Sequence, residues 1–133
     1  MSPSKINKTI KGTGGGQPMS TTDQRLAELR KNYLQAIEHR EADLADSKSD
    51  EEAFKVLANV GAARDALLAA IRAGLTGNAA AIESAYKALA TGNQVIEAAR
   101  KAQEKLTSLL KKLAGTTSAA TDLAKALGKQ NKK

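Results

Sequence analysis

The chain has 133 residues, a formal net charge of +7, no cysteine, and only two tyrosines and one phenylalanine as aromatic residues. This length suits a single domain with a modest core, and the lack of cysteine excludes a disulfide framework and a thiolate metal site. So few aromatic rings leave no stacking platform for single-stranded nucleic acid. Alanine and leucine dominate the apolar residues and valine is scarce, so the composition favours helix over sheet.

Residues 1–20 form a basic leader that contains Lys5, Lys8 and Lys11 and no acidic residue. Large apolar groups are too few to offset the entropy of ordering, so we expect this leader to be disordered. Its glycine run lacks the strand and the Lys-Ser/Thr pair of a phosphate-binding loop, which favours a linker. The leader has no apolar core of a Sec signal peptide. A leader of this composition is also compatible with a specialised export signal.

The location of the protein cannot be assigned from the sequence, and the cytoplasm is the default expectation. The longest apolar run, residues 66–71, is far shorter than the ~20 residues that a membrane span requires. Secretion by a non-classical route stays an alternative.

The first helix is expected over about 21–46. Thr21 and Gln24 form a capping-box pattern at its start. His39 lies on the water side and has neither a second histidine nor a cysteine to join it, so it is not a credible metal ligand or activating base. The apolar residues recur at helical spacing. They are Leu26, Leu29, Tyr33, Ile37 and Leu44.

The second helix is expected over about 50–75, after a Ser49 cap followed by acidic residues. Large apolar side chains predict its core stripe, which consists of Phe54, Leu57, Val60, Leu67, Leu68, Ile71 and Leu75. Alanines cover nearly all of the opposite side, where a solvated helix normally carries Lys and Glu. The alanine side is therefore buried in the bundle, a docking surface, or simply a harmless surface. The candidate docking residues are Ala62, Ala66, Ala69 and Ala73.

A heptad pattern predicts a third long helix over about 79–114. The segment 82–88 recurs, lightly altered, as 96–102, and a repeat of two heptads keeps one apolar stripe on one side of a helix. The tripeptide Thr-Gly-Asn at 76–78 returns at 91–93, so a break at Gly92 is the alternative. We favour continuity, with Gly92 allowing close approach of a neighbouring backbone. A short fourth helix over 117–127 and a free basic tail over 129–133 complete the chain.

The expected fold is all-α: an antiparallel three-helix, up-down-up bundle with coiled-coil-like packing, a short C-terminal fourth helix and a disordered N-terminal leader. The sequence contains no zinc-protease, phosphate-loop, dinucleotide or nucleophile-elbow motif. We therefore expect no enzyme activity, no cofactor and no metal.

The leading functional hypothesis is a small helical protein that mediates protein–protein interaction or self-association. The alternative is electrostatic, sequence-independent nucleic-acid binding through the tails and the last long helix. A weaker alternative is an exported effector or antigen-like protein. The candidate polyanion contacts are Lys5, Lys8, Lys11, Lys101, Lys105, Lys112, Lys132 and Lys133.

Overall fold

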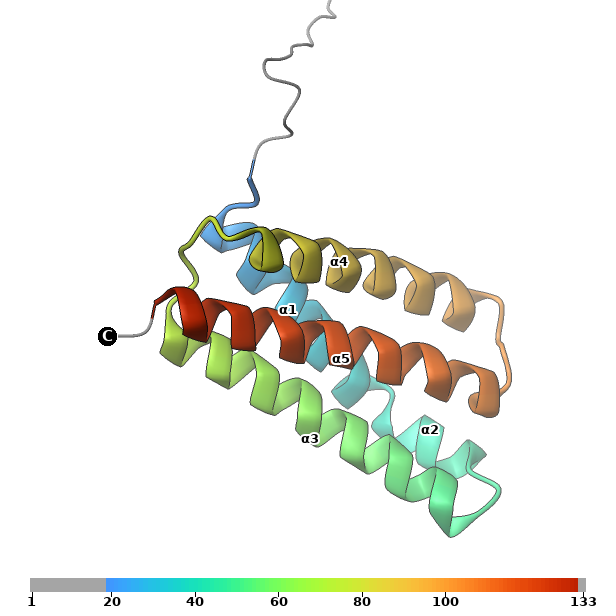
Figure 1. Ribbon diagram of the computed structural model, residues 1–133. Helices are drawn as coiled ribbons and strands as arrows, with labels where there is room; N and C mark the ends of the chain where they lie inside the picture. Colours follow the sequence, from blue (N-terminus) through green and yellow to red (C-terminus); the bar gives the residue numbers. More distant parts are fainter. Residues whose placement is uncertain (1–18, 132–133) are drawn as a thin grey trace, which may run out of the picture.

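The computed structural model describes residues 19–131, and this part of the chain is all-helical (Figure 1). The expected leader therefore lies, except for Met19 and Ser20, outside the described residues, as do Lys132 and Lys133. The helices are α1 (Thr22–Glu38), α2 (Arg40–Asp46), α3 (Asp50–Ala73), α4 (Ala80–Lys101) and α5 (Leu106–Gln130).

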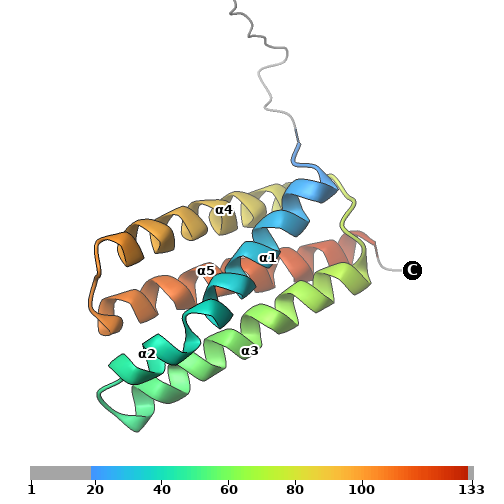
Figure 2. The same cartoon turned by 180° about the vertical axis from the view of Figure 1, so that it is seen from behind.

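Within residues 19–131, the bundle has four long helices where three were expected. Helix α5 lies between α3 and α4, antiparallel to α4 and parallel to α3 (Figure 1). Helix α1 crosses the back of this layer and contacts both α3 and α4, while the short α2 continues it along α3 (Figure 2). The expected short fourth helix is thus a 25-residue element that completes the core.

Local sequence signals explain where α1 and α3 begin. Thr21 and Gln24 form the expected reciprocal capping box, and the Ser49 hydroxyl accepts from the Glu52 amide. The Glu52 carboxylate accepts from the Lys48 amide rather than from the cap residue itself. The first expected helix is interrupted at His39, whose Nδ1 lies 2.9 Å from the Gln35 carbonyl oxygen.

The predicted 79–114 helix breaks, but not at Gly92. Helix α4 runs through Gly92 and ends at Lys101, and Gln103 then takes a left-handed φ of 55°. The Gln103 amide donates to the Arg100 carbonyl and the Glu104 amide to the Ala99 carbonyl, which is the Schellman pattern of a helix end. Glycine usually occupies this position, so a glutamine there gives little sequence signal.

The core has two apolar clusters separated by a buried polar layer. One cluster centres on Leu29, Ile82, Leu89, Leu123 and Leu127, and the other contains Val56, Ile96, Ala99, Leu106, Leu109, Leu110 and Leu113. In the layer between them, the Thr117 hydroxyl donates to Asn59 Oδ1 at 2.6 Å and the Asn32 amide lies 3.3 Å from Thr117 Oγ1. Because buried polar groups need matched partners, this layer fixes how α1, α3 and α5 sit along one another.

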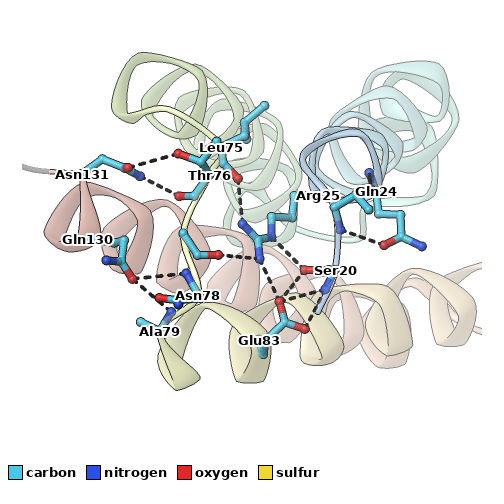
Figure 3. A network of polar contacts seen from close by, with 12 residues as sticks. Ser20, Gln24, Arg25, Leu75, Thr76, Asn78, Ala79, Glu83, Gln130 and Asn131 are labelled. Atoms are coloured by element: carbon cyan, nitrogen blue, oxygen red, sulfur yellow. Dashed lines mark hydrogen bonds and ion pairs between the residues drawn. The ribbon is translucent and has the colours of Figure 1, made fainter. Parts of the chain in front are cut away.

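A buried arginine ties the start of α1 to the α3–α4 connection (Figure 3). Arg25 is 2% exposed and donates to the carbonyls of Leu75 and Gly77, at 2.8 and 3.0 Å. It also pairs with Glu83 of α4 at 2.9 Å, while the Ser20 amide donates to the same carboxylate. A buried guanidinium is tolerated only with such full pairing.

A second ion pair fastens the other end of the bundle. The guanidinium of Arg100 on α4 donates to both carboxylate oxygens of Asp43 on α2, at 3.1 and 3.0 Å, and also to Gln35 of α1. Both partners are largely buried, and bidentate pairing fixes their orientation. The two ion pairs hold α1 and α2 against α4, and the first also holds α1 against the α3–α4 connection.

Gly92→Ala is expected to destabilise the protein. An added Cβ would lie 2.9 Å from both Cβ and Cγ2 of Thr116 on α5. The Thr116 Cβ is bonded directly to the backbone, so it cannot move away freely. We expect a loss of about 1–3 kcal/mol in the free energy of unfolding, measured by urea denaturation. The control is Gly61→Ala on α3, where nothing lies within 4 Å. That change is expected to stabilise by up to about 1 kcal/mol. Stabilisation by both changes would contradict the close approach.

Glu83→Gln is expected to cost stability at neutral pH and to matter little in acid. Burial alone would raise the pKa of Glu83, but the hydrogen bonds from Ser20 and Arg25 outweigh it and hold the pKa below its usual 4.5. A depressed carboxylate pKa stabilises the fold above the unfolded value, and this contribution disappears as the pH falls through the folded value. Denaturation at pH 7 should show a loss of about 1–3 kcal/mol, shrinking below pH ~4.5. The control is Glu97→Gln on α4, because Glu97 is exposed. If Glu83→Gln lowered the free energy of unfolding equally at all pH values, the proposed stabilisation by the Glu83 carboxylate would be contradicted.

Candidate functional site

Helix α3 buries mainly small side chains, and only part of the expected core stripe faces the core. Of that stripe, Leu67 and Leu75 pack partly buried against the core. The buried residues of α3 are Val56, Asn59, Ala63, Ala66 and Ala70. Phe54, Leu57, Leu68 and Ile71 are 68%, 44%, 42% and 49% exposed, although they were expected to form the core stripe. At 3.6 residues per turn the two sets lie roughly 140° apart around the helix axis.

We call six positions of α3 the outer stripe, because they follow coiled-coil core spacing: Phe54, Leu57, Gly61, Arg64, Leu68 and Ile71. Its large apolar members are Phe54, Leu57, Leu68 and Ile71, and Gly61 and Arg64 lie between them. Arg64 pairs with neighbouring Asp65 at 3.3 Å in water. The outer stripe therefore has the spacing of a helix-pairing surface with a small and a charged residue at its centre.

Helix α1 packs against α3 and also exposes large apolar side chains. On α3 itself, Val60 and Leu67 are partly buried. Leu34 and Ile37 of α1 are themselves 44% and 40% exposed. Six large apolar side chains from two adjacent helices thus remain in contact with water. Large contiguous apolar patches on soluble domains mark interaction sites.

The alanines expected at a docking surface instead line a groove between α3 and α5. Ala66 is 4% exposed, Ala69 and Ala73 are partly buried, and only Ala62 is exposed. Thr121, Ala124, Lys125 and Gly128 of α5 form the other wall of this groove, whose volume is about 520 Å³. Burial in the bundle, one of the three alternatives for this side of α3, therefore holds for Ala66, because α5 packs on this side. Whether the groove binds anything stays a prediction.

The described candidate polyanion contacts do not share one helix. Lys101 ends α4, Lys105 precedes α5, and Lys112 lies within α5. The Lys112 ammonium is paired with Glu104, which also holds the pKa of that carboxyl below its usual value. The remaining candidates, Lys5, Lys8, Lys11, Lys132 and Lys133, lie outside the described residues.

A small pocket of about 290 Å³ lies between α1 and α4. Its lining includes Lys31, His39, Asn93, Ile96 and Arg100. Arg100 is already committed to Asp43, and the Asn93 amide donates to the Glu28 side chain at 2.9 Å. Within residues 19–131, Asn93 Oδ1 is a buried acceptor without a donor. The pocket is thus lined by several cations, and its lining contains no nucleophile paired with a base.

Local hydrogen bonds and burial shift the pKa values of several titratable groups in the described chain. The pKa of Glu52 is lowered by hydrogen bonds from the Lys48 amide and the Thr107 hydroxyl, and the pKa of Tyr86 is raised by burial. Among the described residues, no group of three or more His, Asp or Glu side chains is arranged to hold a metal ion. Nor does any helix in this range have the length and apolar character needed to cross a membrane.

The orientation of α3 can be tested by a pair of reciprocal substitutions. Ala70 is fully buried, so Ala70→Leu should overpack the core and cost about 1–3 kcal/mol in the free energy of unfolding. Leu68 lies half-exposed in the outer stripe, so Leu68→Ala should cost less than about 1 kcal/mol under conditions where the protein is monomeric. Thermal or urea denaturation measures both. The opposite ranking would place the leucine side of α3 in the core.

Comparison with known proteins adds no family to this picture. No protein-family model matches the chain, and no curated protein and no solved structure matches it either. The functional conclusion therefore depends on the geometry of the helices and on the residues that they leave exposed.

Proposed function

We propose that this protein is a non-catalytic helical interaction protein that binds another polypeptide through the outer stripe of α3. The observation that carries the proposal is the exposure of four large apolar side chains at coiled-coil spacing on one uninterrupted helix. Such spacing suits the apolar face of an amphipathic helix laid along α3.

The proposed surface is rigid before it binds. Helix α3 is held between α1 and α5, and the Asn59–Thr117 hydrogen bond and the Ser49 cap fix its position and its start. Side chains of the outer stripe therefore change their exposure on binding, but their backbone does not need to reorganise. A preordered surface loses less conformational entropy on association, which favours binding.

The interaction is expected to depend weakly on salt. Fully burying a leucine- or phenylalanine-sized side chain contributes about 1.5–3 kcal/mol, before the cost of association is subtracted. Apolar contacts of this kind are not screened by ions, whereas binding to a polyanion weakens steeply as salt rises. Salt dependence therefore separates this proposal from the electrostatic alternative.

Photo-crosslinking tests the proposed surface in the cells that make the protein. A photoreactive phenylalanine analogue at Leu57 or Leu68 should give covalent adducts with a polypeptide, including a second copy of this chain. The same analogue at Val95 is the matched control, because Val95 is 40% exposed but lies on α4. Adducts at the two stripe positions should persist at raised salt. No adduct at either stripe position, or equal adducts at Val95, would contradict the proposal.

A further inference from the structure

We propose that the occupant of the outer stripe is a second copy of this chain, with the two α3 helices paired antiparallel. This inference rests on the proposed function and names the partner. Its basis is the order of residues along the stripe, the open space at Gly61 and the charges at the two ends of α3.

The stripe pairs with itself when one copy is turned end for end. Its six positions are spaced three, four, three, four and three residues apart, which reads the same in both directions. Antiparallel alignment sets Phe54 opposite Ile71 of the second copy and Leu57 opposite Leu68 of the second copy. Every large apolar side chain then meets another large one. The full set of stripe positions is Phe54, Leu57, Gly61, Arg64, Leu68 and Ile71.

The same alignment sets the one charged member of the stripe opposite its one glycine. A Cβ added at Gly61 would have nothing within 4 Å, so the surface there is open. The aliphatic stem of Arg64 from the second copy fits this space, and its guanidinium reaches water at the edge, where Asp65 already accompanies it. The two-fold axis repeats this arrangement, so both arginines are accommodated. In a parallel alignment each Arg64 would meet the other Arg64, and two like charges would be brought together.

Charges at the ends of α3 favour the antiparallel direction as well. Asp50, Glu51 and Glu52 lie in the first turn and Arg72 lies in the last. In an antiparallel pair at this register, Glu51 lies beside Arg72 of the second copy at both ends of the interface, the flanking geometry that sets orientation in coiled coils. Glu51 is 80% exposed and its present contact with Lys55 is a long 3.8 Å, so it is available for such a pair. The opposed helix dipoles add to the same preference.

The expected dimer is reversible rather than permanent. The exposed parts of Phe54, Leu57, Leu68 and Ile71 come to roughly 800 Å² for a pair of copies, which is at the low end of specific interfaces. We therefore expect a monomer–dimer equilibrium with a micromolar dissociation constant, about 10⁻⁶ to 10⁻⁵ M.

Engineered cysteines test whether the partner is a second copy and whether the two α3 helices run antiparallel. They can be introduced one at a time because the natural chain has no cysteine. Copies carrying Leu57→Cys are mixed with differently tagged copies carrying Leu68→Cys and oxidised gently near the expected dissociation constant. We expect mixed disulfide dimers to form at least ten-fold faster than either variant forms dimers with itself. In the proposed register the two Leu57 positions are separated by roughly 16 Å along the axis, far beyond disulfide reach. Val95→Cys on α4 measures the rate of random collision.

The outcomes separate this inference from the proposed function. Faster self-crosslinking of Leu57→Cys would mean a parallel pair, and rates equal to those of Val95→Cys would mean that no α3 pair forms. Either result overturns the antiparallel dimer. If stripe photoadducts contain only another polypeptide, the proposed function stands without the dimer, and if neither adducts nor disulfides form, both fail.

Exchanging the charges at the two ends of α3 tests the dimer independently. Sedimentation measures how strongly each variant dimerises. Arg72→Glu should weaken the dimer several-fold, and adding Glu51→Arg to the same chain should restore it. Both residues are exposed in the monomer, so neither change is expected to unfold it. Weakening without restoration would contradict the proposed register.

Discussion

The close approach of α5 to α3 and α4 is the constraint on which the arrangement depends. Helices approach most closely where small side chains meet, and this bundle places them where α5 inserts. Ala66 and Ala70 of α3 lie in the same buried cluster as Ala119 and Ala120 of α5, and Gly92 of α4 faces Thr116. Because α5 occupies the alanine side of α3, the side with larger residues is left toward water. The outer stripe is therefore a consequence of how the core is built.

The volume of the core is supplied unequally by the four long helices. Helices α4 and α5 contribute Ile82, Leu89, Ile96, Leu123 and Leu127, whereas α3 contributes mainly alanines. Large side chains from one element fill the space above small ones from another, which keeps the interior densely packed. Helical periodicity separates the two sides of α3 but does not state which is buried, and the usual preference for burying leucine gave the wrong answer. Gly61 and Arg64, interrupting the leucine side, were the available signal.

Features that depend on a few neighbouring residues could be predicted from the sequence, and features that depend on distant ones could not. The all-helical class, the Thr21 and Ser49 caps and the continuity of α4 through Gly92 are confirmed. The break after Lys101 was missed because Leu110 continues the seven-residue spacing of Ile82, Leu89 and Ile96. Leu106 and Leu113 continue that of Ala85 and Ala99, so the pattern shows no interruption. A left-handed Gln103 carries no composition signal comparable with glycine. The outer stripe was not recognised from the sequence either. Which side of α3 is buried depends on where α5 packs, and no local pattern shows that.

Buried polar contacts fix the positions of the helices that carry the exposed apolar side chains. Arg25 at one end and the Asn32–Thr117–Asn59 layer in the middle restrict how α1 aligns with α3. The Asp43–Arg100 pair at the other end fixes α2 against α4. An all-alanine and leucine interior would allow helices to slide, since apolar contacts are not directional. Matched hydrogen bonds restrict such sliding, because each shifted alignment would strand a buried donor or acceptor. Leu34, Ile37 and the outer stripe are therefore held at fixed spacing, and a fixed spacing is what pairing with another helix requires.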